Sequence, residues 1–162
     1  MIALIWAQDQ NGLIGNAGQL PWHLPADLKR FKQLTLDHKI VMGHTTFAGF
    51  KKPLPHRENM VLSRQDLTLP AGVEQLHSID ELWALDAARP NEMIFVIGGS
   101  QVFEAVLPKA DRLYRTIIDD TFSGDTWMPT IDYTNWHLVD RQAGVTDVKN
   151  PYRFQFEDYV RG

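Results

Sequence analysis

Cysteine is absent from the 162 residues of this chain. That absence excludes a disulfide framework, a thiolate metal site and a thiol nucleophile. The six histidines do not replace them, because they show neither the helical i, i+4 pair nor the close spacing of common metal motifs. We therefore expect no bound metal ion and a chemistry that needs no cysteine.

A strong excess of charge of one sign is also missing. The formal net charge is −4 with acidic and basic residues interspersed, which argues against a nucleic acid or an anionic membrane as a partner. No apolar run approaches the roughly 20 residues that span a bilayer. The opening MIALIWAQDQ has no basic leading segment and no small-residue cleavage site, so we expect a cytoplasmic protein.

The composition that remains is that of a globular protein. Hydrophobic residues make up 44% and charged residues 22% of the chain, and this length suffices for one compact domain with an ordinary core. Since no linker or internal repeat interrupts the sequence, we expect a single domain over residues 1–162.

Apolar runs and helical periodicities alternate along the chain, and these patterns predict strands and helices respectively. Strands are predicted over residues 2–7, 39–42, 59–63, 93–97, 112–118, 137–141 and 152–160, helices over 25–36, 45–49, 78–88 and 102–107, and a loop over 8–18. The alternation predicts an α/β fold with a mainly parallel central sheet of about eight strands, flanking helices on both faces and an antiparallel C-terminal strand.

Ligands of such sheets bind beyond the carboxyl ends of the strands. Three segments follow predicted strand ends: Gly43-His44-Thr45-Thr46, Ser63-Arg64 and Gly98-Gly99-Ser100-Gln101. In the two glycine turns the backbone can approach closely and the next helix offers free N–H groups, so both could share one pyrophosphate. Ser63 and Arg64 could grip a phosphate. Taken singly, each glycine turn is explained better as an ordinary strand-to-helix turn than as a ligand site. Arg64 is likewise explained better as a solvated loop arginine.

Asp27 is the most informative single residue. It precedes Phe31 by four positions and Leu34 by seven, so it falls on the apolar face of its predicted helix. Burial there raises a carboxyl pKa unless a partner offsets it, which suits a proton donor or a binder of a cationic heterocycle. The ordinary alternative is an acid favoured by the dipole in a first helical turn. No nucleophile elbow or P-loop is present, so a bound cofactor is the expected source of reactivity.

Nine short segments follow one another in order over nearly the whole chain: Ile5-Trp6-Ala7, Gly12-Leu13-Ile14-Gly15, Leu20-Pro21-Trp22-His23-Leu24-Pro25-Ala26-Asp27-Leu28, Val41-Met42-Gly43, Thr46-Phe47, Pro53-Leu54-Pro55, Arg57-Glu58-Asn59, Ile97-Gly98-Gly99 and Gly124-Asp125-Thr126. Together they resemble the bacterial dihydrofolate reductase family, and the longest segment combined with the glycine pair is highly specific. A fold of that family is therefore expected.

The resemblance implies an oxidoreductase that uses NADPH to reduce 7,8-dihydrofolate to 5,6,7,8-tetrahydrofolate. Hydride would pass from nicotinamide C4 to pterin C6, with protonation at N5, in support of one-carbon metabolism and thymidylate synthesis. Small-molecule substrate and antifolate inhibitors are the implied ligands, and a monomer is the implied state. Residues 9–23 resemble the family's mobile active-site loop, Asp125 resembles a residue that supports it, and the Gly98–Gly99 bond is expected to be cis.

The same resemblance assigns the site residues. The implied catalytic set is Asp27, Trp22 and Thr116, with Asp27 on the pterin 2-amino group and N3. The implied substrate set is Ile5, Leu20, Asp27, Leu28, Phe31, Phe50, Leu54, Arg57, Ile97 and Thr116, with Arg57 on the glutamate α-carboxylate. The implied cofactor set is Ala7, Ile14, Gly15, Gly43, His44, Thr45, Thr46, Leu62, Ser63, Arg64, Ile97, Gly98, Gly99, Ser100, Gln101, Val102, Phe103 and Thr126. His44 departs from the arginine that many relatives carry, which removes one fixed cation near the phosphates.

Two other functions stay open on the sequence. A reductase of the same fold that acts on a pyrimidine of riboflavin synthesis is disfavoured by the segment 22–28 and by Arg57. A non-catalytic nucleotide-binding module would keep the glycine turns, but it would have no need of Asp27 on an apolar helix face.

Overall fold

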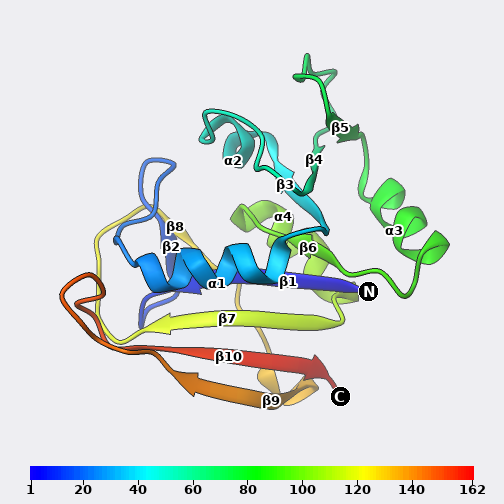
Figure 1. Ribbon diagram of the computed structural model, residues 1–162. Coiled ribbons are helices and arrows are strands. Elements are labelled where there is room, and N and C mark those ends of the chain that lie inside the picture. Colours follow the sequence, from blue (N-terminus) through cyan, green and yellow to red (C-terminus); the bar gives the residue numbers. More distant parts are fainter.

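An eight-stranded sheet forms the centre of the computed structural model, which describes residues 1–162 (Figure 1). The strands are β1 (Ile2–Gln8), β3 (Lys39–Gly43), β4 (Glu58–Leu62), β5 (Val73–Leu76), β6 (Ile94–Val96), β7 (Arg112–Ile118), β9 (Trp136–Ala143) and β10 (Phe154–Arg161). Their order across the sheet is β5-β4-β3-β6-β1-β7-β10-β9. The pairs from β5 to β7 are parallel, and β10 runs antiparallel to both β7 and β9. The predicted sheet is confirmed.

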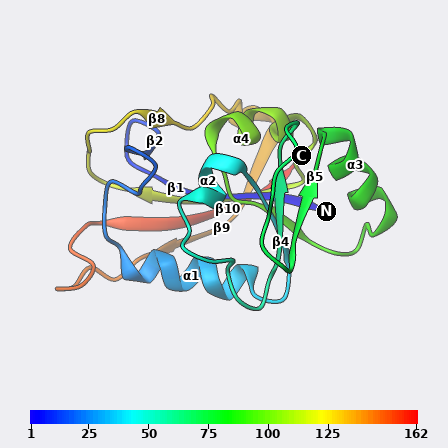
Figure 2. The same cartoon turned by 90° about the horizontal axis from the view of Figure 1, so that it is seen from above.

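Helices cover both faces of this sheet. They are α1 (Pro25–Thr35), α2 (His44–Ala48), α3 (Ile79–Ala88) and α4 (Ser100–Val106), with short 3₁₀ helices at Leu107–Lys109 and Tyr133–Asn135. Seen from above, α1 lies on one side of the sheet and α3 and α4 on the other (Figure 2). None of the helices has both the length and the apolar character needed to cross a membrane.

The central strand β1 is buried because both faces of the sheet are covered next to it. Residues 2–6 are all nearly inaccessible to solvent, as a continuous apolar run predicts for a central parallel strand. One core cluster on the sheet includes Trp6, Val41 and Phe103, and a second includes Ile5, Met42 and Phe95. Successive side chains of a strand point to opposite faces, so the two clusters lie on opposite sides of the sheet.

Two expectations about local structure were wrong. Residues 8–18 do not form a loop throughout, because β2 (Leu13–Gly15) pairs antiparallel with β8 (Thr126–Trp127) in a separate small sheet. The edge strand β5 was not expected either. Both elements are short and owe their pairing to partners elsewhere in the chain, and a local periodicity does not reveal such partners.

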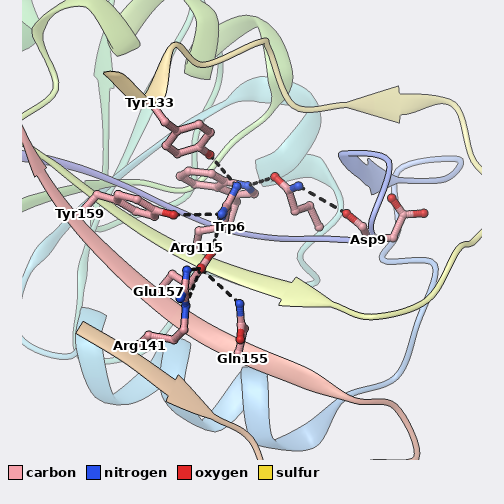
Figure 3. Close-up of polar contacts among 9 residues, drawn as sticks. Trp6, Asp9, Arg115, Tyr133, Arg141, Gln155, Glu157 and Tyr159 are labelled. Atoms are coloured by element: carbon pink, nitrogen blue, oxygen red, sulfur yellow. Dashed lines mark hydrogen bonds and ion pairs between the residues drawn. The ribbon is translucent and has the colours of Figure 1, made fainter. Parts of the chain in front are cut away.

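A buried ion cluster lies on the sheet face opposite α1 (Figure 3). Glu157 of β10 is 1% exposed and accepts hydrogen bonds from the guanidinium groups of Arg115 and Arg141 and from the Gln155 amide. Arg115 also donates to the hydroxyls of Tyr133 and Tyr159, at 2.9 and 3.0 Å. The cluster ties β7, β9 and β10 together.

Candidate active site

Asp27 and Thr116 meet where α1 begins and β7 approaches its carboxyl end. The Thr116 hydroxyl donates a hydrogen bond of 2.6 Å to Asp27 Oδ1. Thr116 is buried between the neighbouring strands, paired in register with Ala7 of β1 and Phe156 of β10. Asp27 therefore lies against the sheet, as its position on the apolar helix face predicts.

The first turn of α1 is held in place from a distant part of the chain. Pro25 fits this turn because its fixed φ matches a helix and its missing N–H needs no partner. Leu24, the N-cap residue, offers no side-chain acceptor. Instead the Ala26 N–H donates to Asn150 Oδ1 at 2.8 Å, and Asp147 orients Asn150 by accepting from its amide and its backbone N–H. Asn150 thus fixes the turn that carries Asp27.

The electrostatic surroundings of Asp27 raise its pKa above the usual aspartate value. Burial is the dominant cause, because it disfavours the charged carboxylate. The hydrogen bond from Thr116 and the positive charge of Arg30 act in the opposite direction without cancelling burial. A carboxyl group in this setting can exchange a proton or pair with a protonated heterocycle.

An apolar wall adjoins the carboxylate. Five residues of the expected substrate set belong to one cluster on the α1 face of the sheet: Ile5, Phe31, Phe50, Leu54 and Ile97. Leu20 and Leu28 expose 48% and 47% of their surface, and Leu28 directly follows Asp27. The structure thus brings most of this set together beside one charged group.

Trp22 lies just before α1, near the same end of the helix as Asp27. Its ring is buried against Phe122, with 5.3 Å between centroids, and Phe122 in turn contacts Tyr152. The indole Nε1 is buried and has no hydrogen-bond partner within the protein. A donor that is buried and unpaired is costly unless it serves a ligand or water, which makes Trp22 a polar contact point of this region.

Arg57 is oriented by its neighbours just before β4. Nε donates to the Pro55 carbonyl at 2.9 Å and Nη1 to the Thr35 hydroxyl at 3.2 Å. Partial burial lowers its pKa from the usual arginine value, yet a guanidinium stays charged in proteins. The remaining N–H groups are free to bind a carboxylate.

The two glycine turns lie against each other. The Gly98–Gly99 peptide bond is cis, as expected, and the Gly43 N–H donates to Gly98 O at 2.9 Å. A Cβ added at Gly43 would lie 3.2 Å from Val102 Cγ2, so only glycine allows this approach without displacement. Gly43 and Gly99 are the N-caps of α2 and α4, and neither helix has a side-chain cap. The free N–H groups of both turns suit an anion.

The other residues of the expected cofactor set surround these turns at different depths. Ile14, Leu62, Val102 and Phe103 belong to the core cluster that includes Trp6. A Cβ at Gly98 or at Gly99 would lie 3.6 Å from the Thr46 hydroxyl. A second group is exposed to solvent: His44, Thr45, Arg64 and Gln101. Ala7 packs with Trp22, Gly15 pairs with Thr126, and the Ser63 hydroxyl accepts from Gln65 N–H.

Sequence reasoning missed Asp9, a fully buried carboxylate that organises the loop after β1. Its Oδ1 accepts from the N–H groups of Asn11 and Leu13, and its Oδ2 from that of Phe122, each at 2.9 Å. The side chain therefore joins the 9–15 segment to the segment that supports Trp22. Asp9 stands in an Asp-Gln-Asn-Gly run, which is typical of an ordinary turn. No local signal in the sequence distinguishes an exposed turn aspartate from a buried one that organises the loop.

Comparison with known proteins identifies relatives of the whole chain. The family model for dihydrofolate reductase matches residues 1–161. The dihydrofolate reductase of Enterococcus faecium is 43% identical over 163 residues, covering 99% of this chain and 97% of the relative. That of Bacillus subtilis is 43% identical over 161 residues, covering 99% and 95%. A solved structure of Enterococcus faecalis dihydrofolate reductase complexed with NADP(H) and RAB-propyl has a TM-score of 0.94 at 44% identity, covering 100% of this chain and 96% of that one.

Proposed function

Since the chain belongs to the dihydrofolate reductase family, we propose that it reduces 7,8-dihydrofolate to tetrahydrofolate with NADPH, and that Asp27 is the group that binds the pterin. The chain is an oxidoreductase that uses NADPH, and small-molecule ligands bind it. The observation that carries the role of Asp27 is its hydrogen bond with Thr116 beside an apolar wall.

Asp27 orients the pterin. Its ionised carboxylate accepts from the 2-amino group and N3, while the Thr116 hydroxyl holds one carboxylate oxygen in place. Ile5, Phe31 and Phe50 supply the apolar surface on which the ring and the aminobenzoyl group lie. The free N–H groups of Arg57 bind the glutamate α-carboxylate. Fixing the ring at both ends selects one reactive pose, which is a large part of what an enzyme contributes to a transfer reaction.

The residues present fit the cofactor. The glycine turns offer uncapped helix N-termini and a close backbone approach, which suits a pyrophosphate. The Ser63 hydroxyl and the exposed Arg64 guanidinium suit the 2′-phosphate. Ala7, Ile14 and Gly15 border the nicotinamide. When bound, NADPH supplies the hydride that passes from C4 to pterin C6.

The loop at residues 9–23 excludes water from the reacting centre. Support comes from the contacts that hold its middle, since Asp125 accepts from Ala17 N–H at 3.1 Å and donates its own N–H to Gly15 O at 3.1 Å. Excluding water strengthens the interaction between Asp27 and a pterin that carries positive charge. The proton for N5 arrives through a single water molecule, which the exclusion of bulk water by the loop does not prevent, and Asp27 polarises the ring that receives this proton.

A comparison of two substrates tests this function. Purified protein is mixed with NADPH and either dihydrofolate or the pyrimidine substrate of the riboflavin-pathway reductase, and oxidation of NADPH is followed optically. Oxidation with dihydrofolate alone supports the proposal. Oxidation only with the pyrimidine, or binding of NADPH without turnover of either compound, contradicts it. We also propose that the protein acts as a cytoplasmic monomer, which sedimentation at working concentration would check for the oligomeric state.

A further inference from the structure

Arg30 of α1 forms an ion pair with Asp158 of β10. It follows Asp27 by one helical turn on α1, and its Nη2 lies 2.5 Å from Asp158 Oδ1 of β10. Its guanidinium also lies 4.3 Å from the centre of the Phe156 ring. The Arg30 and Asp158 side chains are only 18% and 17% exposed, so this ion pair is shielded from solvent much more than a surface pair.

The anchor of Arg30 lies next to the partner of Asp27. Phe156, which the guanidinium covers, is paired in register with Thr116, whose hydroxyl binds Asp27. Asp158 is paired with Tyr114 two positions further along the same two strands. The sheet that positions Thr116 thus also carries both groups that contact the Arg30 guanidinium.

We propose that Arg30 is a positioning residue of this active site: anchored by Asp158 and Phe156, it keeps a fixed positive charge that favours the ionised form of Asp27. Asp158 limits this effect, because it shares the charge of Arg30. The inference rests on the proposed function for its consequence in catalysis, since an ionised Asp27 is the form that binds a protonated pterin.

No other cation on the neighbouring elements takes the place of Arg30. β7 presents Thr116 and Tyr114, with Arg112 farther along and its guanidinium 5.5 Å from the Tyr114 ring. β10 presents Asp158, which lies opposite Asp140 of β9. The facing part of β1 contributes the uncharged Ile5. Among charged groups, Arg30 is the one that lowers the pKa of Asp27 against the rise that burial imposes.

The charge of Arg30 acts on Asp158 as well as on Asp27. Burial raises the pKa of Asp158, the charge of Asp140 adds to this rise, and Arg30 opposes it. Asp158→Asn keeps a side-chain oxygen that can accept a hydrogen bond from Arg30, so the anchor is retained while the negative charge that opposes Arg30 is removed. The change should then strengthen the field of Arg30 at Asp27.

The experiment measures the acidic limb of the kcat/KM profile and, separately, the titration of the Asp27 carboxyl carbon by NMR in the ligand-free protein. Arg30→Met should move the Asp27 midpoint to higher pH by about half a unit or more, and Asp158→Asn should move it to lower pH. Arg30→Lys, which keeps the charge, should remain near the wild type. Lys29→Met is the matched control, because it removes a positive charge from an exposed neighbouring position of the same helix.

Coincident midpoints for Arg30→Met and Lys29→Met overturn the inference, as does a rise in the midpoint for Asp158→Asn. A loss of thermal stability in Arg30→Met without a change in the midpoint has the same meaning, since it assigns Arg30 a purely structural role. Failure of the wild type to reduce dihydrofolate would contradict the proposed function instead, and the NMR titration would still decide whether Arg30 acts on Asp27.

Discussion

The Thr116 hydroxyl donates a hydrogen bond of 2.6 Å to Asp27 Oδ1, although 89 positions separate the two residues in the chain. α1 supplies the carboxyl group and β7 supplies the donor, so the pair exists only in the assembled fold. Burial raises the pKa of Asp27 and this hydrogen bond lowers it. Because burial and the hydrogen bond shift the pKa of Asp27 in opposite directions, removing the hydrogen bond tests how much it contributes.

Thr116→Val should raise the pKa of Asp27 further, because the hydrogen bond that favours the ionised form is lost while burial remains. A hydrogen bond to a charged group is worth about 1.5–3 kcal/mol, so kcat/KM near neutral pH should fall by roughly ten-fold or more. The acidic limb of the pH profile should move to higher pH. Thr116→Ser keeps the hydroxyl and serves as the control, and an equal loss in both variants would contradict the role of the hydrogen bond.

Asn150→Ala should weaken activity although Asn150 is not among the expected site residues. The variant removes the acceptor for the Ala26 N–H, which fixes the turn that carries Asp27. Loss of a helix cap costs about 1 kcal/mol of stability. We also expect kcat/KM to fall, because Asp27 is less firmly positioned, while the affinity for NADPH alone stays unchanged. Urea unfolding and cofactor titration provide the two measurements. An unaltered kcat/KM in a variant destabilised by this amount would show that Asn150 serves the fold only.

Asp9→Ala should destabilise the protein and loosen the loop that follows β1. Three backbone N–H groups lose their acceptor, and each buried donor left unpaired costs about 1–3 kcal/mol. Hydrogen exchange should accelerate at the amides of Leu13 and Phe122 more than at amides of the central strand β1. Uniform acceleration across the chain would contradict a local role for this carboxylate.

Glu157 should make stability depend on pH in the acid range. Burial alone would raise its pKa, but the hydrogen bonds and charges of Arg141 and Arg115 lower it below the usual glutamate value. The contribution of Glu157 to the free energy of unfolding is therefore fully present above the unfolded-state pKa of about 4. This contribution is lost as pH falls through the lower folded-state pKa.

Glu157→Gln should abolish that part of the pH dependence and cost about 3 kcal/mol or more, because the largely buried Arg115 loses its counter-charge. Urea unfolding at a series of pH values checks both effects. Glu104→Gln is the control, since Glu104 is exposed on α4. Parallel stability curves for wild type and Glu157→Gln in acid would contradict the assignment.

The sequence pattern within one segment predicted those structural features that depend only on the residues of that segment. The apolar run of β1, the apolar face of α1 with Asp27 and the two glycine turns were all predictable, because periodicity and glycine chemistry act locally. Asp9, Arg30 and Asn150 were not, since each acquires its role from a partner that only the tertiary fold brings near. The pairing of β2 with β8 was missed for the same reason.

The measurement that tests the central claim most directly is NADPH oxidation in the presence of dihydrofolate by wild type and by Asp27→Asn. Asparagine keeps the size of the side chain but removes the charge that, in the proposed mechanism, binds and polarises the pterin. The account predicts rapid oxidation by the wild type and a collapse of kcat in the variant at neutral pH, with NADPH binding retained. Equal rates for the two proteins would contradict the role assigned to Asp27.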